Sequence, residues 1–206
     1  MARSRSSQRW LREHFDDAWV KRARQEGYRG RAVYKLEELD RRYQLLEGVR
    51  RAVDLGAAPG SWCEYLARQA RGRIRIVALD LLPMEPVPGV DFIQGDFTSD
   101  EVLAALTRRL AGQPLDLVLS DMAPNMSGME AVDQPRAMYL AELAVDFAAE
   151  RLRPGGRLLC KLFQGEGFDE LVRSVRGQYE KVMVRKPRAS RPRSREVYLV
   201  ATGRKL

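Results

Sequence analysis

The chain has 206 residues, of which 45% are hydrophobic, and a formal net charge of +8. This length suits one domain with a full core, and no run of 18 uncharged apolar residues predicts a membrane span. The N-terminus lacks an apolar signal core and the only cysteines are Cys63 and Cys160, so we expect a reduced cytoplasmic protein. One histidine nearly excludes a His-based metal cluster or catalytic triad, and we expect no metal.

The positive charge is concentrated at two places in the chain. Residues 1–31 hold nine Lys or Arg against four acids, and residues 185–195 hold six against none. The segment 32–184 holds 19 basic and 23 acidic residues. A solvated basic surface is the simpler explanation, but it would scatter the charge along the chain. The pattern therefore favours a polyanionic partner.

In chain order, the hydrophobic pattern first predicts two helices, over 8–24 and 31–43. Strands then alternate with helices: strands over 51–55, 74–80, 90–93, 115–121 and 157–163, and helices over 61–70, 99–111 and 135–152. We expect Gly155-Gly156 to close the helix that precedes them. After a helix over 167–177, strands over 181–186 and 196–202 pair antiparallel through the basic loop 187–195.

This alternation predicts an α/β fold, a doubly wound and mostly parallel sheet with helices on both faces. We expect residues 1–30 to form a basic N-terminal helical extension and residues 31–206 to form a single domain. In such a sheet, ligands bind beyond the carboxyl ends of the strands.

The first strand ends in DLGAAPGSW, a turn with the spacing G-x-x-x-G. Gly56 and Gly60 let the backbone turn and approach a ligand, and Ser61 can cap the next helix. The dinucleotide fingerprint G-x-G-x-x-G is absent, which argues against pyrophosphate but leaves a nucleoside ligand open.

Carboxylates end the next two strands. Asp80 can accept hydrogen bonds from ribose hydroxyls, and Asp96 can accept one from an adenine amino group, while Phe97 or Trp62 packs on apolar parts. Each carboxylate alone can equally be a helix cap. Together with the turn they favour a cofactor with ribose and adenine but no phosphate, S-adenosylmethionine rather than NAD.

Two lysines stand out in a chain with 30 arginines and six lysines. Lys161 lies in the apolar strand LLCKLF and Lys35 in the helix AVYKLEEL. A desolvated lysine, unlike an arginine, can lose its proton and act as a base. The simpler explanation for either lysine is a side chain that reaches water along an edge or surface. Asp121, after the fourth strand, and Glu196, at the start of the last, can converge on the same rim; Glu196 can also be an ordinary surface charge.

DLGAAPGSW, SDMAPNMSG, the lysine of CKLF and SREVYLVA together resemble the FtsJ/RrmJ family of RNA ribose 2′-O-methyltransferases, and the resemblance covers nearly the whole chain. It implies the Rossmann-like fold of class I S-adenosylmethionine-dependent methyltransferases, with seven mostly parallel strands and one antiparallel strand. It also implies a catalytic tetrad of Lys35, Asp121, Lys161 and Glu196. The cofactor residues that it implies, with the neighbouring turn positions, are Gly56, Pro59, Gly60, Trp62, Asp80, Asp96 and Asp121.

The resemblance further implies S-adenosylmethionine-dependent methylation of a uridine ribose in the peptidyl-transferase region of large-subunit ribosomal RNA. The implied partner is ribosomal RNA within the large subunit, and the implied state is a monomer away from membranes. Three alternatives stay open: another RNA target such as transfer RNA, a non-catalytic RNA-binding assembly factor, and a nicotinamide-dependent oxidoreductase. The missing G-x-G-x-x-G argues against the third.

Overall fold

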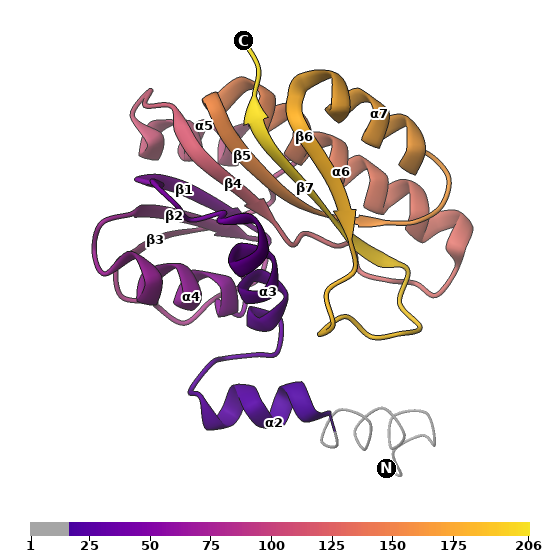
Figure 1. Cartoon of the computed structure of the whole chain (residues 1–206), viewed down its shortest axis with the longest axis horizontal. Coiled ribbons are helices and arrows are strands. Elements are labelled where there is room, and N and C mark those ends of the chain that lie inside the picture. The colour runs from indigo at the N-terminus through magenta and orange to yellow at the C-terminus, as the bar shows by residue number, and fades with distance from the viewer. Residues whose placement is uncertain (1–16) are drawn as a thin grey trace.

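A computed structural model describes residues 17–206 (Figure 1). The first described helix is α2, Ala18–Gln25, so most of the predicted helix over 8–24 lies outside the described residues. Asp17 caps α2 through its side chain, which accepts a hydrogen bond from the Trp19 amide. The division between an extension and a domain near residue 30 stays a prediction.

Seven strands form one sheet in the order β3-β2-β1-β4-β5-β7-β6. They are β1 (Arg51–Leu55), β2 (Arg75–Asp80), β3 (Val90–Gln94), β4 (Leu115–Ser120), β5 (Leu152–Phe163), β6 (Tyr179–Arg185) and β7 (Glu196–Arg204). Only β7 runs antiparallel to its neighbours, β5 and β6. This arrangement confirms the predicted fold class.

The other helices are α3 (Val33–Tyr43), α4 (Ser61–Ala70), α5 (Asp100–Leu110), α6 (Glu130–Arg151) and α7 (Phe168–Gln178). Side chains of α3 and α4 share one hydrophobic core, and those of α5, α6 and α7 share another on the opposite face of the sheet. In Figure 1, α2 and the loop between β6 and β7 both lie below the sheet, at the carboxyl ends of the parallel strands.

The two cores follow the twofold alternation of the strands. In β1, Val53 and Leu55 belong to the core under α5–α7, while Ala52 belongs to the core under α3 and α4. The central strand β4 is buried along its whole length. Such strands read as continuous apolar runs, which is why the sequence pattern located them well.

The prediction that Gly155-Gly156 closes a helix is wrong. Helix α6 ends at Arg151, and both glycines lie within β5, where the pairing with β4 jumps from Leu115↔Leu152 to Leu117↔Arg157. The two glycines therefore form a bulge. A Cβ on Gly156 would lie 2.8 Å from the carbonyl oxygen of Arg153, so this close backbone approach needs glycine.

Cys63 and Cys160 are both buried free thiols, as the sequence predicts. Within residues 17–206, no helix is long and apolar enough to cross a membrane. In the same residues, no group of three or more His, Cys, Asp or Glu side chains is arranged to hold a metal ion.

Candidate active site

The ends of the two central strands β4 and β5 bring Asp121 and Lys161 together. The strands pair in parallel up to Ser120↔Cys160, so the next residue of each strand emerges at the same edge. The Lys161 ammonium donates to the backbone carbonyl of Asp121 at 2.6 Å and lies 3.1 Å from its carboxylate. Only 9% of the Lys161 side chain is exposed, which excludes a side chain that escapes to water.

A second ion pair joins α3 to the start of β7. The Lys35 ammonium lies 2.6 Å from the Glu196 carboxylate, and both side chains are mostly buried. Glu196 pairs with Phe163, the last residue of β5, because β7 runs antiparallel. The four residues of the predicted tetrad thus meet at one edge of the sheet, and neither Lys35 nor Glu196 is an ordinary surface charge.

Tyr198 joins the two ion pairs, and the sequence reasoning missed it. Its hydroxyl accepts a hydrogen bond from Lys35 at 3.2 Å and donates one to the Asp121 carboxylate at 2.7 Å. The signal was available in the motif SREVYLVA. Since side chains alternate along a strand, Tyr198 must share a face with Glu196, two residues earlier, and it lies opposite Lys161 on β5.

This network keeps Asp121 ionised. Burial alone would raise the pKa of its carboxyl, but Lys161, Lys35 and the Tyr198 hydroxyl outweigh burial and hold that pKa below its usual value. Burial and the Asp121 carboxylate raise the pKa of Tyr198 well above its ordinary value, so its hydroxyl stays protonated. The site therefore holds a fixed negative charge between two ammonium groups.

Beside this network lies a cavity of about 700 Å³ along the carboxyl ends of β1, β2, β3 and β4. Of the predicted cofactor residues, Gly56, Asp80, Asp96 and Asp121 line it, as does Lys161. Phe97 also lines the cavity, where the sequence reasoning expected an aromatic contact. An added Cβ on Gly56, whose φ is +76°, would lie 2.7 Å from the Met122 amide nitrogen, so glycine is required here.

The two predicted adenosine-binding carboxylates also organise the backbone around them. Asp80 accepts hydrogen bonds from the amides of Ala58 and Leu82, both at 2.8 Å. Asp96 accepts from the Thr98 amide and hydroxyl, and these bonds lower its pKa. Neither carboxylate is a helix cap, because no helix lies between β2 and β3 and the N-cap of α5 is Ser99; both carboxylates line the cavity.

Pro59, Gly60 and Trp62 do not line the cavity with their side chains. The Trp62 ring is buried beside Tyr198, and its indole nitrogen donates to the Ala32 carbonyl at 2.8 Å. It does not pack where a cofactor ring would lie, contrary to one of the options considered. The first helical amide to find an intrahelical acceptor is that of Glu64, which bonds to Gly60, so earlier amides of α4 are available to a ligand.

Ser61 does not cap α4. The cap position is Gly60, with a φ of +108°, and the Ser61 hydroxyl is buried without a hydrogen-bond partner. The helix begins one residue before a Ser61 cap would place it, because only glycine adopts this backbone conformation without strain.

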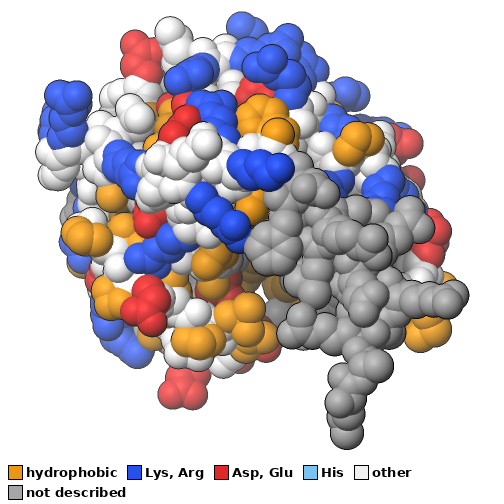
Figure 2. Space-filling view, turned by 90° about the horizontal axis from the view of Figure 1, so that it is seen from below, with side chains coloured by type: hydrophobic (Ala, Val, Ile, Leu, Met, Phe, Trp, Pro, Cys, Tyr) orange, Lys and Arg blue, Asp and Glu red, His pale blue; other side chains and the backbone are white. Residues whose placement is uncertain are grey.

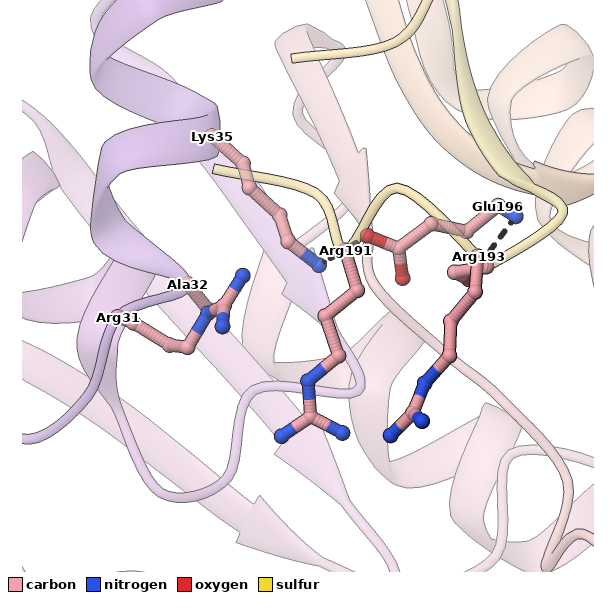
Figure 3. Close-up of a pocket in the computed structure, with 7 residues that line it drawn as sticks. Arg31, Ala32, Lys35, Arg191, Arg193 and Glu196 are labelled. Carbon is pink, nitrogen blue, oxygen red and sulfur yellow. Dashed lines mark hydrogen bonds and ion pairs between the residues drawn. The ribbon is translucent and has the colours of Figure 1, made fainter. Parts of the chain in front are cut away.

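A second cavity of about 390 Å³ opens on the other side of the network (Figure 3). It is lined by Arg31, Ala32, Lys35, Arg191, Arg193, Ser194 and Glu196. In Figure 3, Arg191 and Arg193 point to the same side of the Lys35–Glu196 pair. Burial and the nearby Arg191 lower the pKa of Arg31, which indicates cations held close together. The cavity is therefore suited to an anion.

The four predicted catalytic residues divide evenly between the two cavities. Asp121 and Lys161 line the carboxylate-rich one, and Lys35 and Glu196 line the basic one. Figure 2 looks onto this edge of the sheet and shows Lys and Arg side chains gathered on it, with fewer Asp and Glu. The arrangement can bring a small molecule and a polyanion to the two sides of one network of ion pairs.

One further buried acid escaped the sequence reasoning. Asp54, in β1, is fully buried and accepts a hydrogen bond from the Cys63 thiol at 3.1 Å, while its other oxygen has no partner. Burial raises its pKa to about 7. The only signal in the sequence was that this acid lies inside the first predicted strand, three residues before Ala57 in DLGAAPGSW.

Comparisons with known proteins agree with this geometry. The model of the FtsJ-like methyltransferase family matches residues 28–204. The chain is 58% identical over 203 residues to the ribosomal RNA large subunit methyltransferase E of Legionella pneumophila strain Paris, covering 98% of each chain. It is 56% identical to the protein of the same name from Hydrogenovibrio crunogenus, over 205 residues and the full length of both.

Among solved structures, a putative ribosomal RNA methyltransferase from Plasmodium falciparum superposes with a TM-score of 0.76 at 31% identity, covering 86% of this chain and 98% of the other. Human methyltransferase-like protein 13, solved with SAH, gives a TM-score of 0.56 at 16% identity, covering 85% and 80%. The second similarity speaks for the fold alone.

Proposed function

Because the chain belongs to the FtsJ-like methyltransferase family, we propose that it transfers a methyl group from S-adenosylmethionine to the ribose 2′-hydroxyl of a uridine in large-subunit ribosomal RNA. The observation that carries this proposal is the tetrad shared between two cavities of different character. The name of the relatives, a ribosomal RNA large subunit methyltransferase, supports the class of substrate.

The carboxylate-rich cavity suits the proposed methyl donor. Asp80 can accept hydrogen bonds from the two ribose hydroxyls and Asp96 from the adenine amino group. The free amides at the start of α4, including that of Trp62, can bind the carboxylate of the methionine part. The donor supplies a methyl group on a positively charged sulfur, and the Asp121 carboxylate provides a favourable field for that charge.

The basic cavity suits the acceptor strand. Arg31, Arg191 and Arg193 can bind phosphates on either side of the target nucleotide, which directs the ribose toward Lys35 and Glu196. A requirement for the 2′-hydroxyl then separates RNA from DNA at this position.

The transfer is an in-line displacement. The C–S bond to the methyl group breaks with its electron pair going to sulfur, while the ribose oxygen forms the new O–C bond. Lys161 loses its own proton to solvent when the substrate binds, and its neutral amine then takes the hydroxyl proton and becomes an ammonium again. Asp121 orients that amine and the hydroxyl, and Lys35 with Glu196 positions the ribose. Holding both reactants in this alignment supplies much of the acceleration.

Mapping 2′-O-methylation in RNA from cells with and without the gene tests the proposal. We expect one uridine of large-subunit ribosomal RNA to lose its methyl group, and the purified protein to restore it in the presence of S-adenosylmethionine. Loss of a methyl group from transfer RNA, and not from ribosomal RNA, would show that transfer RNA is the substrate. Unchanged methylation together with retained RNA binding would indicate a non-catalytic assembly factor.

A further inference from the structure

One short segment, residues 28–32, contacts the surroundings of both cavities. At its start, Arg29 is held by five hydrogen bonds to three separate parts of the chain. Two residues later, Arg31 lines the basic cavity. The segment therefore connects the two sites through the backbone.

Arg29 fixes two walls of the carboxylate-rich cavity against each other. Its guanidinium donates to the Pro59 carbonyl at 3.0 Å, in the turn after β1, and to the carbonyls of Glu85 and Pro86 at 2.5 and 2.8 Å, in the loop after β2. The same turn and loop contribute Ala58 and Leu82 to the cavity. Without the Arg29 guanidinium, these three contacts between the walls would be lost.

Arg29 is also anchored to α4 with little free space. Its backbone amide and Nε both donate to the Glu64 carboxylate at 3.0 Å. A Cβ added to Gly60 would lie 3.0 Å from the Arg29 guanidinium, and one added to Gly30 would lie 3.0 Å from the Ser61 hydroxyl. The segment thus packs directly on the start of α4, so a shift of one moves the other.

The other end of the segment is tied to the basic side of the molecule. Arg31 forms an ion pair with Asp17 and donates to the carbonyl of Ala189, in the loop 187–195. The Ala32 carbonyl accepts from the Trp62 indole at 2.8 Å. An anion that binds at Arg31 therefore acts on the same short segment that holds the cofactor walls.

We propose that Arg29 is a positioning residue that couples the two sites, so that RNA bound at the basic cavity tightens binding of the methyl donor or its product. The identity of the two coupled ligands rests on the proposed function. RNA that reduces the motion of residues 28–32 also holds Arg29 against the turn after β1 and the loop after β2. The methyl donor or its product then loses less conformational entropy of the protein when it binds. By linkage, the methyl donor must tighten RNA binding by the same factor.

The test measures the dissociation constant of S-adenosylhomocysteine for the full chain, without RNA and with saturating unmethylated large-subunit ribosomal RNA made by transcription. We expect RNA to lower it by about 5-fold or more, with an equal effect of S-adenosylhomocysteine on RNA binding. In the Arg29→Lys and Arg29→Gln variants, we expect two fold-changes to approach one: the effect of RNA on S-adenosylhomocysteine binding and the effect of S-adenosylhomocysteine on RNA binding. A merely structural role would weaken binding of either ligand alone and leave the factor unchanged.

Arg68→Lys is the matched control. Arg68 also ties α4 to the N-terminal segment, through the carbonyls of Glu26 and Gly27 at 3.1 and 2.7 Å, but it contacts neither cavity wall. We expect this variant to keep the wild-type factor. An Arg29→Lys variant that keeps the factor, or an Arg68→Lys variant that loses as much, would overturn the proposal.

Amide hydrogen exchange in the wild-type protein gives a second test, which does not depend on whether a variant folds. RNA alone should slow exchange of the amides at residues 60–63 and of Met84, Glu85 and Val87, and unchanged rates would count against the coupling. Binding of both ligands without mutual effect would overturn the coupling and leave the proposed function standing. Failure of the wild-type protein to bind S-adenosylhomocysteine would overturn both.

Discussion

At the scale of single residues, the two lysines of the network have different surroundings. Lys161 faces a carbonyl and a carboxylate of the same residue, Asp121, whereas Lys35 lies between Glu196 and the Tyr198 hydroxyl. Arginine would satisfy these acceptors more readily but cannot give up its proton. The choice of lysine in a chain with 30 arginines fits the proton transfer that we propose for this site.

Lys161→Arg separates a base from a guiding charge. The variant keeps a positive charge near Asp121 but removes the group that takes the proton, so we expect methyl transfer to fall by about 100-fold or more. Binding of S-adenosylmethionine should change little. Transfer to RNA measured with a labelled methyl group checks this, with Lys181→Arg, exposed on β6, as the control. A rate near that of the wild type would make Lys161 an electrostatic guide.

Tyr198→Phe tests the residue that joins the ion pairs. The hydroxyl helps to lower the pKa of Asp121, so its removal should raise that pKa. Activity that needs ionised Asp121 is lost as the pH falls through this pKa, and in the variant the loss should begin at higher pH. We also expect the rate at neutral pH to fall by about 10-fold, from one lost charge-assisted hydrogen bond. The measurement is the pH profile of methyl transfer.

Tyr179→Phe is the control for this variant. Tyr179 is a buried tyrosine of β6 in the same sheet, and its hydroxyl has no hydrogen-bond partner. It should leave the pH profile unchanged. If both variants shift the profile equally, the effect belongs to packing and not to the bond with Asp121.

Asp54→Asn tests the buried acid of β1. Its pKa is about 7 in the folded protein. Between about pH 4 and pH 7 the folded protein therefore keeps a proton on Asp54 that the unfolded chain has lost. Wild-type stability should therefore fall as the pH rises from about 4 to about 7. The variant lacks this fall and should be more stable than the wild type at pH 8, by a few kcal/mol at most, and similar at pH 4, by roughly the same linkage.

Denaturant unfolding at several pH values measures this difference. Asp116→Asn provides the opposite sign, because two backbone amides and Arg153 outweigh burial and lower the pKa of Asp116. Its contribution to stability is present at neutral pH and disappears as the pH falls through its folded pKa. An Asp54→Asn variant whose stability follows the wild-type pH dependence would contradict the assignment.

At the scale of elements, the loop 187–195 contributes Arg191, Arg193 and Ser194 to the basic cavity. It is held in place from several sides: the Arg188 amide donates to Glu38 at 2.9 Å, and Lys186 donates to the carbonyls of Pro192 and Ser194 at 3.0 and 2.6 Å. These bonds hold its arginines at the carboxyl edge of the sheet. The loop can thus bind phosphates without forming part of the cofactor cavity.

Charge reversal in this loop should separate the two binding functions. In a variant that combines Arg188→Glu, Arg191→Glu, Arg193→Glu and Arg195→Glu, we expect RNA affinity to fall by about 100-fold or more at low salt, because the loop then repels the phosphates that it would otherwise attract. S-adenosylmethionine binding measured without RNA should stay within about 2-fold, since screening weakens charges at that separation. Equal loss of both affinities would refute this division.

The matched control places the same change of charge elsewhere. Suitable positions are exposed arginines that line neither cavity, namely Arg50, Arg108, Arg173 and Arg176. Since the net charge is then identical, any larger effect of the loop variant reports its position and not the overall charge.

The sequence predicted the elements well and some of their side chains poorly. Apolar strands between amphipathic helices are strong local signals, and the strand-end rule brought Asp121 and Lys161 to one edge. The β5 bulge was missed because a pair of glycines after a helical pattern predicts a helix end. Only the pairing of β5 with β4 shows that Gly155 and Gly156 belong to a strand. Trp62 was misjudged for the same reason: the direction of its ring depends on Tyr198, 136 positions further along the chain.

At the scale of the whole molecule, folding brings together two basic segments that lie far apart in the sequence. Arg31 comes from the first basic segment and Arg191 and Arg193 from the second, yet all three line one cavity. The slightly acidic body of the chain supplies the carboxylates of the other cavity. The molecule thus places an arginine-lined cavity and a carboxylate-lined cavity at the same edge of its sheet.

This separation predicts a different salt dependence for the two ligands. Each phosphate that the arginines neutralise releases counterions, so the logarithm of RNA affinity should fall linearly with the logarithm of salt concentration. With about four phosphate contacts to a single strand, the slope is about −3, which is about a 50-fold loss between about 50 and 200 mM salt. S-adenosylmethionine affinity should change by less than about 2-fold over this range.

Titrations at several salt concentrations measure both slopes, and the loop variant makes the test specific. Removing its four arginines should flatten the RNA slope toward zero, whereas the matched control at Arg50, Arg108, Arg173 and Arg176 should keep most of it. A DNA strand of the same sequence should bind with a similar slope and remain unmethylated, because phosphates supply the affinity and the 2′-hydroxyl the chemistry. A steep salt dependence that survives the loop variant would move the RNA-binding surface away from this edge.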